Sequence, residues 1–177
     1  MSHTLRNFSP SDADAVNRLA LRAFEQFRGE YSDWEAFSRN IGSMASLSTS
    51  GELIVASDQD RIVGAVVYVG PHKPKREFFS IEWPILRMLV VDPAHRGQGI
   101  GRVLTQECIN RAQRDSASVI ALHTSPIMQV ALPMYLRMGF MFEREAPSIL
   151  GVSYGVYIKR LHAQHGAPAD APKAARR

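Results

Sequence analysis

The sequence lacks several features that would set it apart from ordinary globular proteins. Its 177 residues include one cysteine, Cys108, so no disulfide can form within the chain, and a free thiol suits a reducing compartment. No apolar run reaches the roughly 18 residues of a membrane span. Residues 1–10 have neither the apolar core of a signal peptide nor an Arg-rich transit pattern. We therefore expect one compact domain in the cytoplasm, without a membrane partner.

The net charge of the chain is also small. The 21 Lys and Arg residues exceed the 17 Asp and Glu residues by four. Residues 162–177 have nothing to bury in a core, so we predict a disordered basic tail after a single domain of residues 1–161. This charge balance does not by itself indicate a nucleic-acid partner. An interaction protein that binds an acidic partner or nucleic acid through the tail is one alternative function.

The spacing of apolar residues predicts an α/β domain with a mixed sheet. Apolar side chains recur every three or four residues in four segments and alternate or run continuously in seven others. In chain order we predict strand 3–8, helix 13–28, helix 34–44, strands 52–57, 61–69 and 85–91, helix 100–113, strand 119–124, helix 128–138, and strands 140–146 and 152–161. This is the order β-α-α-β-β-β-α-β-α-β-β. Its strand-helix-strand units favour helices on both faces of the sheet.

A glycine-rich turn links strand 85–91 to helix 100–113. It contains three glycines in five positions, in the segment Arg96-Gly97-Gln98-Gly99-Ile100-Gly101-Arg102. Such a turn lets main-chain amides converge at a helix N-terminus, an arrangement that suits the oxygens of a pyrophosphate. The spacing differs from that of a Walker loop and from the dinucleotide fingerprint. A capping turn without a ligand is the alternative.

Two motifs together resemble a known family. Arg96–Gly101 resembles the Arg/Gln-x-x-Gly-x-Gly/Ala signature of the GCN5-related N-acetyltransferases (GNAT), and the lead-in Leu89–Pro93 matches as well. The segment Tyr135–Phe140 resembles the family's second hallmark, a tyrosine followed by Gly-Phe at the end of the fourth helix. The predicted element order also agrees, so the resemblance extends over residues 3–161. It implies the GNAT-like acyl-CoA N-acyltransferase fold.

The resemblance implies an enzyme that transfers acetyl from acetyl-CoA directly to a primary amine of a small molecule, peptide or protein. Its cofactor-binding residues would be Leu89, Val90 and Val91, through their main chain, and Arg96, Gly97, Gln98, Gly99, Ile100, Gly101 and Arg102, around the pyrophosphate. Tyr135 would protonate the departing thiolate, a role that a phenol of pKa about 10 can fill. The alternative for Tyr135 is an ordinary half-buried helix tyrosine.

The match has two gaps at the acceptor side. Many relatives have a glutamate base where this chain has Ile85, and an asparagine where it has Met128. The nearest ionisable residues are Glu82, which we take as the candidate base, and His123. Their alternatives are a solvated glutamate and a buried core histidine. Cys/His clusters at metal-ligand spacing are absent from the sequence, so we expect no metal.

Further alternatives remain at this point. The two gaps leave open a catalytically weak acyl-CoA sensor of the same fold. The basic loop of residues 71–76 is either a solvated loop or a surface that faces an acidic acceptor. The family also includes many dimers, so the resemblance admits a homodimer. The fold alone does not choose the acceptor amine.

Overall fold

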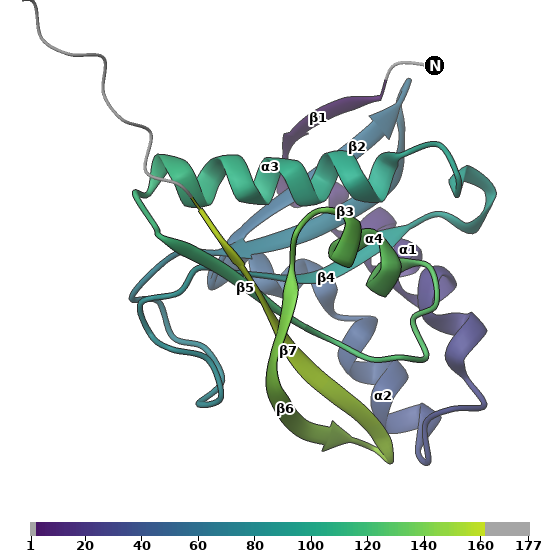
Figure 1. The fold of residues 1–177 in the computed structure, drawn as a ribbon. Helices are drawn as coiled ribbons and strands as arrows, with labels where there is room; N and C mark the ends of the chain where they lie inside the picture. The colour runs from purple at the N-terminus through teal and green to yellow at the C-terminus, as the bar shows by residue number, and fades with distance from the viewer. Residues whose placement is uncertain (1–2, 162–177) are drawn as a thin grey trace, which may run out of the picture.

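A computed structural model describes residues 3–161 and shows one seven-stranded mixed sheet (Figure 1). The strands lie in the order β1-β2-β3-β4-β5-β7-β6. The elements are β1 (Thr4–Asn7), α1 (Ala13–Phe24), α2 (Trp34–Ile41), β2 (Glu52–Asp58), β3 (Arg61–Val69), β4 (Ile85–Val91), α3 (Ile100–Arg114), β5 (Val119–Thr124), α4 (Ala131–Arg137), β6 (Met141–Ile149) and β7 (Val152–Arg160). This confirms the predicted fold class and element order. The predicted tail, residues 162–177, lies outside the described residues.

The helices cover both faces of the sheet (Figure 1). One cluster of buried side chains joins α1 and α2 to the sheet and includes Leu19, Phe37 and Ile85. A second cluster, on the other face, joins α3 and α4 to it and includes Leu104 and Tyr135. We call these the α1–α2 face and the α3–α4 face. Within residues 3–161, no helix is long and apolar enough to cross a membrane.

β4 contains an irregularity that the sequence did not predict. Met88 has a φ of 54°, and the register between β4 and β3 shifts beside it. Ile85 packs in the α1–α2 cluster, and so do Met88 and Val90. The strand's alternation therefore changes phase after Arg87, as at a β-bulge, and puts Arg87 and Met88 on the same face.

β4 and β5 diverge soon after they meet. Their one register pair within the described residues is Ile85 with Ala121, and the Ala121 N–H donates to the Pro84 carbonyl at 3.0 Å. β5 instead pairs along its whole length with β7, from Val119 to Thr124. The C-terminal part of β4 therefore has β3 on one side and no paired strand on the other. We call this separation the β4–β5 opening.

Pro133 shortens α4 relative to the prediction. The apolar spacing predicts a helix from Met128 that Pro133 kinks or confines to the residues after it, but α4 begins at Ala131, so Pro133 lies in its first turn. Proline is tolerated there because amides of the first turn have no partner within the helix. The predicted end is confirmed, since Gly139 follows the helix with a φ of 89°.

Candidate functional site

The glycine-rich turn lies between the end of β4 and the first turn of α3. Gly97 and Gly99 have φ values of 77° and 79°. A Cβ atom built on either glycine would meet no other atom within 4 Å. Gly99 is the N-cap of α3, and no side chain there accepts from the helix's first amides. Free amides beside open space at a helix N-terminus fit a pyrophosphate.

Asp92 anchors the start of this turn. Asp92 is 3% exposed, and its carboxylate accepts from the Ala94 N–H at 2.9 Å and from Arg22 and Arg61 at 3.0 Å each. Burial alone would raise the pKa of Asp92, but these hydrogen bonds and positive charges hold it below its usual value. The ionised carboxylate therefore ties the turn to α1 and β3.

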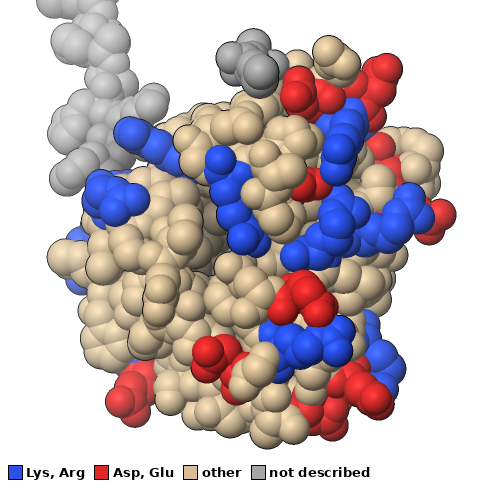
Figure 2. Space-filling view, turned by 90° about the vertical axis from the view of Figure 1, so that its right-hand side faces the viewer, with Lys and Arg blue, Asp and Glu red and all other residues tan. Residues whose placement is uncertain are grey.

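Arg96 also contacts α1. Its guanidinium donates to the Ala23 carbonyl at 3.1 Å and to Gln26 Oε1 at 3.4 Å. Because its side chain is held in this way, the main chain of the turn is the principal feature available to a ligand. Figure 2 shows the face on which α3 begins, where Lys and Arg side chains gather beside a hollow.

Main-chain groups of Leu89 and Val91 face the β4–β5 opening. The Asp92 N–H donates to the Val63 carbonyl at 2.8 Å, so Asp92 and Val90 direct their polar groups toward β3. The intervening Leu89 and Val91 direct theirs to the other side, where β5 has diverged. These groups can donate to and accept from an extended ligand arm in the opening.

The structure brings this part of β4 close to the turn. A Cβ atom on Gly101 would lie 3.7 Å from Leu89 Cδ2 and from Val91 Cγ2, and 3.5 Å from Met134 Sδ of α4. The predicted binding residues of β4 and of the turn therefore form one continuous surface with α4.

Tyr135 lies on the α3–α4 face. Its side chain is 4% exposed, and its ring packs edge to face with Phe140 at a centroid distance of 5.7 Å. Burial, with a smaller contribution from Cys108, raises the pKa of Tyr135 above its ordinary value of 10. The phenol therefore stays protonated near neutral pH and is available as a proton donor.

His123 lies on the α1–α2 face, and its Nδ1 is buried without a hydrogen-bond partner among residues 3–161. Three rings pack around it, at centroid distances of 5.5, 5.8 and 5.3 Å: those of Phe78, Phe79 and Tyr154. Burial, together with the positive charges of Arg76 and Arg87, lowers the pKa of His123 from 6.5 to about 4. The imidazole is therefore neutral at pH 7 and a weak base.

The other candidate positions differ in their surroundings. Glu82 is exposed in the turn before β4. Ile85 is a core side chain with 3% exposure. The sulfur of Met128 accepts from the Thr124 hydroxyl at 3.3 Å. No carboxylate therefore stands at Ile85, and the role of Glu82 as base stays a prediction.

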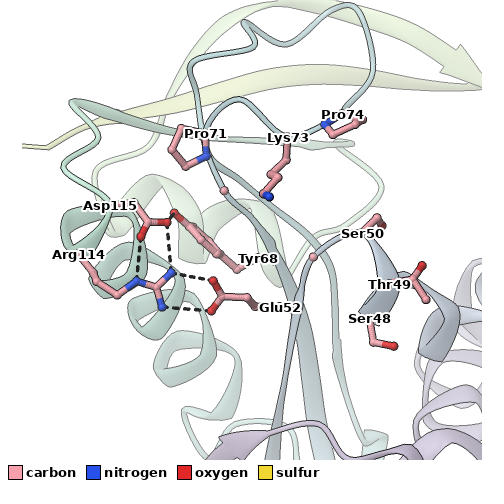
Figure 3. A pocket seen from close by; sticks show the side chains of 12 residues that line it. Ser48, Thr49, Ser50, Glu52, Tyr68, Pro71, Lys73, Pro74, Arg114 and Asp115 are labelled. Carbon is pink, nitrogen blue, oxygen red and sulfur yellow. Dashed lines mark hydrogen bonds and ion pairs between the residues drawn. The ribbon is translucent and has the colours of Figure 1, made fainter.

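A surface hollow of about 720 Å³ lies at the far end of α3, away from the glycine-rich turn (Figure 3). Three of its charged side chains, those of Glu52, Arg114 and Asp115, are joined by ion pairs. Arg114 joins Glu52 at 2.7 Å and Asp115 at 2.8 Å, and the Tyr68 hydroxyl donates to Asp115 at 2.8 Å. These four residues fasten the end of α3 to β2 and β3, so we assign them a structural role. In the part of the chain that the structure describes, no three His, Cys, Asp or Glu side chains are grouped to hold a metal ion.

Residues 13–140 match the family model described as "Acetyltransferase (GNAT) family". The chain belongs to the GNAT family. The resemblance carried by the glycine-rich turn and the Tyr135 segment is thereby confirmed.

Curated relatives are similar to parts of this GNAT chain. N-acetyltransferase 8F1 of Rattus norvegicus is 31% identical over 94 residues, which cover 53% of this chain and 41% of the relative. The chain thus matches less than half the length of that protein. The uncharacterized N-acetyltransferase YdgE of Bacillus subtilis is 22% identical over 151 residues, which cover 79% of this chain and 92% of YdgE.

Solved GNAT structures share the fold. A GCN5-related N-acetyltransferase from Rhodopseudomonas palustris has a TM-score of 0.72 at 20% identity and covers 91% of this chain and 97% of its own. The PaiA N-acetyltransferase of Thermoplasma acidophilum, solved with coenzyme A, has a TM-score of 0.71 at 17% identity, with 91% and 100% covered. YncA of Salmonella typhimurium, solved with acetyl-CoA, has a TM-score of 0.68 at 16% identity, with 97% and 100% covered. These similarities confirm the fold.

Proposed function

We propose that this GNAT protein transfers acetyl from acetyl-CoA directly to a primary amine, without a covalent intermediate on the enzyme. The observation that carries the proposal is the β4–β5 opening, along which Leu89 and Val91 present main-chain groups that no strand of residues 3–161 pairs. The opening continues to the glycine-rich turn, whose free amides fit a pyrophosphate. PaiA and YncA, which share the fold, were solved with coenzyme A and acetyl-CoA. This support leads us to propose the same ligand here.

Acetyl-CoA would supply an activated acetyl thioester, and the amine nitrogen would form a bond to its carbonyl carbon as the carbon–sulfur bond breaks. The main-chain N–H of Leu89 would donate to the carbonyl oxygen and stabilise its developing negative charge. Residues 96–102 would hold the pyrophosphate, and Leu89, Val90 and Val91 the extended arm. Tyr135 would donate its phenolic proton to the departing thiolate and regain one from solvent.

The proton of the amine needs a separate route. Ile85 carries no titratable group, and the imidazole of His123 is too weak a base to hold that proton at pH 7. We propose that the acceptor binds as the neutral amine, or that water takes its proton. Glu82 remains the protein's candidate base, although its exposed position in the turn before β4 leaves it open to solvent. We also propose a cytoplasmic location and no metal requirement.

A broad amine and peptide panel tests the proposal. Release of coenzyme A should depend on the amine, and mass spectrometry should find one acetyl group on the acceptor nitrogen. Tight acetyl-CoA binding without turnover of any amine would contradict the proposed reaction.

That outcome would favour the second candidate function, an acyl-CoA sensor of the same fold. The observation in its favour is that Ile85 and Met128 stand where many relatives carry polar catalytic groups.

A further inference from the structure

The loop between β3 and β4 uses Lys75 to close on itself. The Lys75 ammonium donates to the carbonyls of Gly70, Lys73 and Ile81, at 3.4, 2.8 and 3.0 Å. The three carbonyl acceptors use all three N–H donors of the ammonium group and fix the position of the side chain. Lys75 is therefore committed to the loop and is not a free cation for a ligand.

Arg144 of β6 holds the same loop from outside. Its guanidinium donates to the Phe78 carbonyl at 2.9 Å and lies 5.6 Å above the ring of Trp83. The Phe78 ring in turn packs edge to face on His123 of β5. The loop is thus pinned against the α1–α2 face, beside the β4–β5 opening.

Arg87 lies on this face next to His123. Ile85 and Ala121 both pack in the α1–α2 cluster, and Arg87 and His123 each follow by two residues, so strand alternation puts both side chains on that face. Arg87 precedes the β-bulge and is on the α1–α2 face because it follows Ile85 by two residues. Its side chain is half-buried. Arg76 belongs to the loop whose Phe78 ring packs on His123, and burial together with the positive charge of Arg76 lowers the pKa of Arg87.

Neither Arg87 nor Arg76 forms an ion pair or a side-chain hydrogen bond within residues 3–161. Some other arginines around the sheet have carboxylate partners, among them Arg6, Arg22, Arg61, Arg111 and Arg114. A half-buried cation beside a second cation is unfavourable without a counter-ion. The local arrangement is therefore complementary to an anion.

Building on the proposed function, we propose that the acceptor is a free amino acid, whose carboxylate binds Arg87 and Arg76 while its amine enters the β4–β5 opening. Leu89, the amide donor of the proposed reaction, follows Arg87 by two residues, with the bulge at Met88 between them. In an α-amino acid the amine and the carboxylate are bonded to the same carbon. One small molecule can therefore place its carboxylate at Arg87 and its amine in the β4–β5 opening. Guanidinium groups bind carboxylates through paired hydrogen bonds. The N-terminus of a peptide has no carboxylate at this position.

Matched acceptors test the proposal in the full-length protein. Phenylalanine and leucine are compared with their primary amides and with phenethylamine and isopentylamine, at equal concentrations of neutral amine. We expect kcat/KM for the acids to exceed that for the amides and amines at least tenfold. Arg87→Gln should remove most of this preference and leave kcat/KM for the uncharged acceptors nearly unchanged. Arg76→Gln, in an exposed loop position, should reduce the preference severalfold.

Arg18→Gln is the matched control, because Arg18 is exposed on α1 and makes no ion pair among the described residues. It should behave like the parent. If Arg87→Gln fails to fold, Arg76→Gln and Arg87→Lys carry the test, since lysine keeps the charge without the bidentate fork. A binding readout accompanies these rates: N-acetylphenylalanine and its amide are titrated by calorimetry into the protein saturated with coenzyme A.

The outcomes separate the two proposals. Amine acetylation with no preference for acids, or an equal loss for acids and amides in Arg87→Gln, overturns the carboxylate site and leaves the proposed function standing. Arg87-dependent binding of the carboxylate without turnover of any amine supports the site and overturns the proposed reaction. Equal binding of N-acetylphenylalanine and its amide by the parent contradicts the carboxylate site.

Discussion

Arg87 and Met88 are consecutive in β4, yet both side chains face α1 and α2. This relationship depends on the β-bulge at Met88, whose φ is 54°. Before the bulge, Arg87 shares the α1–α2 face with His123, and beyond the bulge the main chain of Leu89 faces the β4–β5 opening. One local irregularity therefore aligns the proposed acceptor site with the proposed acetyl site.

Gly99→Ala should weaken coenzyme A binding. Gly99 adopts a φ of 79°, which disfavours any side chain by about 1–2 kcal/mol even though the space around it is open. Relief of that strain would move the amides of the turn, so we expect the Kd for coenzyme A to rise at least about tenfold. Calorimetric titration measures the Kd. Gly29→Ala is the control, because Gly29 also borders open space but has no positive φ. Equal affinities for both variants would remove the turn from the binding site.

Tyr135→Phe should lower kcat and leave the Kd for acetyl-CoA nearly unchanged. The hydroxyl acts when the thiolate departs, and general acids contribute about 10²–10⁴-fold to such steps. Because burial raises the pKa of Tyr135, no loss of rate from its ionisation should occur below about pH 10. Tyr157→Phe, on β7, is the control and should retain the parent's rate. A parental kcat in Tyr135→Phe would restrict Tyr135 to packing.

The pH profile should follow the acceptor rather than a protein base. We expect kcat/KM to rise with pH and level off near the pKa of the acceptor amine, and to shift when an acceptor of lower pKa is used. Glu82→Gln and His123→Ala should keep that profile. Steady-state rates with two acceptors of different pKa are sufficient to measure it. A plateau between about pH 6 and 8 that is common to both acceptors, and that Glu82→Gln abolishes, would assign the base to Glu82.

His123 should make the fold less stable in mild acid. Its pKa is about 4 in the folded protein and near 6.5 when unfolded, so the unfolded chain binds a proton first as pH falls. Full stability is present above pH 6.5 and is progressively lost down to pH 4. Between pH 7 and pH 5 the parent should lose about 2 kcal/mol more than His123→Phe. Urea unfolding at both values measures this. The exposed variant His72→Asn should follow the parent, and identical pH dependence in the parent and His123→Phe would contradict the prediction.

Much of the fold could be predicted from local pattern. Apolar periodicity gave every strand and α-helix in order, and β4 and β5 have the predicted bounds. The predicted helices 13–28 and 34–44 end earlier, at Phe24 and Ile41, where 3₁₀ turns or a loop follow. Glycine spacing located the turn that begins α3. The start of α4 was predicted too early because apolar spacing continued through Pro133, whose position in the first turn depends on local hydrogen bonding.

The acceptor side could not be predicted in the same way. The bulge at Met88 has no marker in an apolar strand sequence. The contacts of Arg96 with Ala23, and of Arg144 with Phe78, join residues that are 73 and 66 positions apart. The sequence of the basic loop admits an acidic acceptor as one alternative. Only the folded structure shows that Lys75 donates to carbonyls of its own loop, whereas the Arg76 side chain has no hydrogen-bond partner among residues 3–161.

The sheet consists of two half-sheets, β1–β4 and β5–β7. Within residues 3–161 they are joined by the one register pair between Ile85 and Ala121. Within residues 3–161 no further register pair joins the two halves, and the helices on each face pack against both of them. A pantetheine-like chain bonded to Leu89 and Val91 would extend the first half-sheet as an added edge. The bound substrate would then fill the β4–β5 opening and connect the two half-sheets through hydrogen bonds.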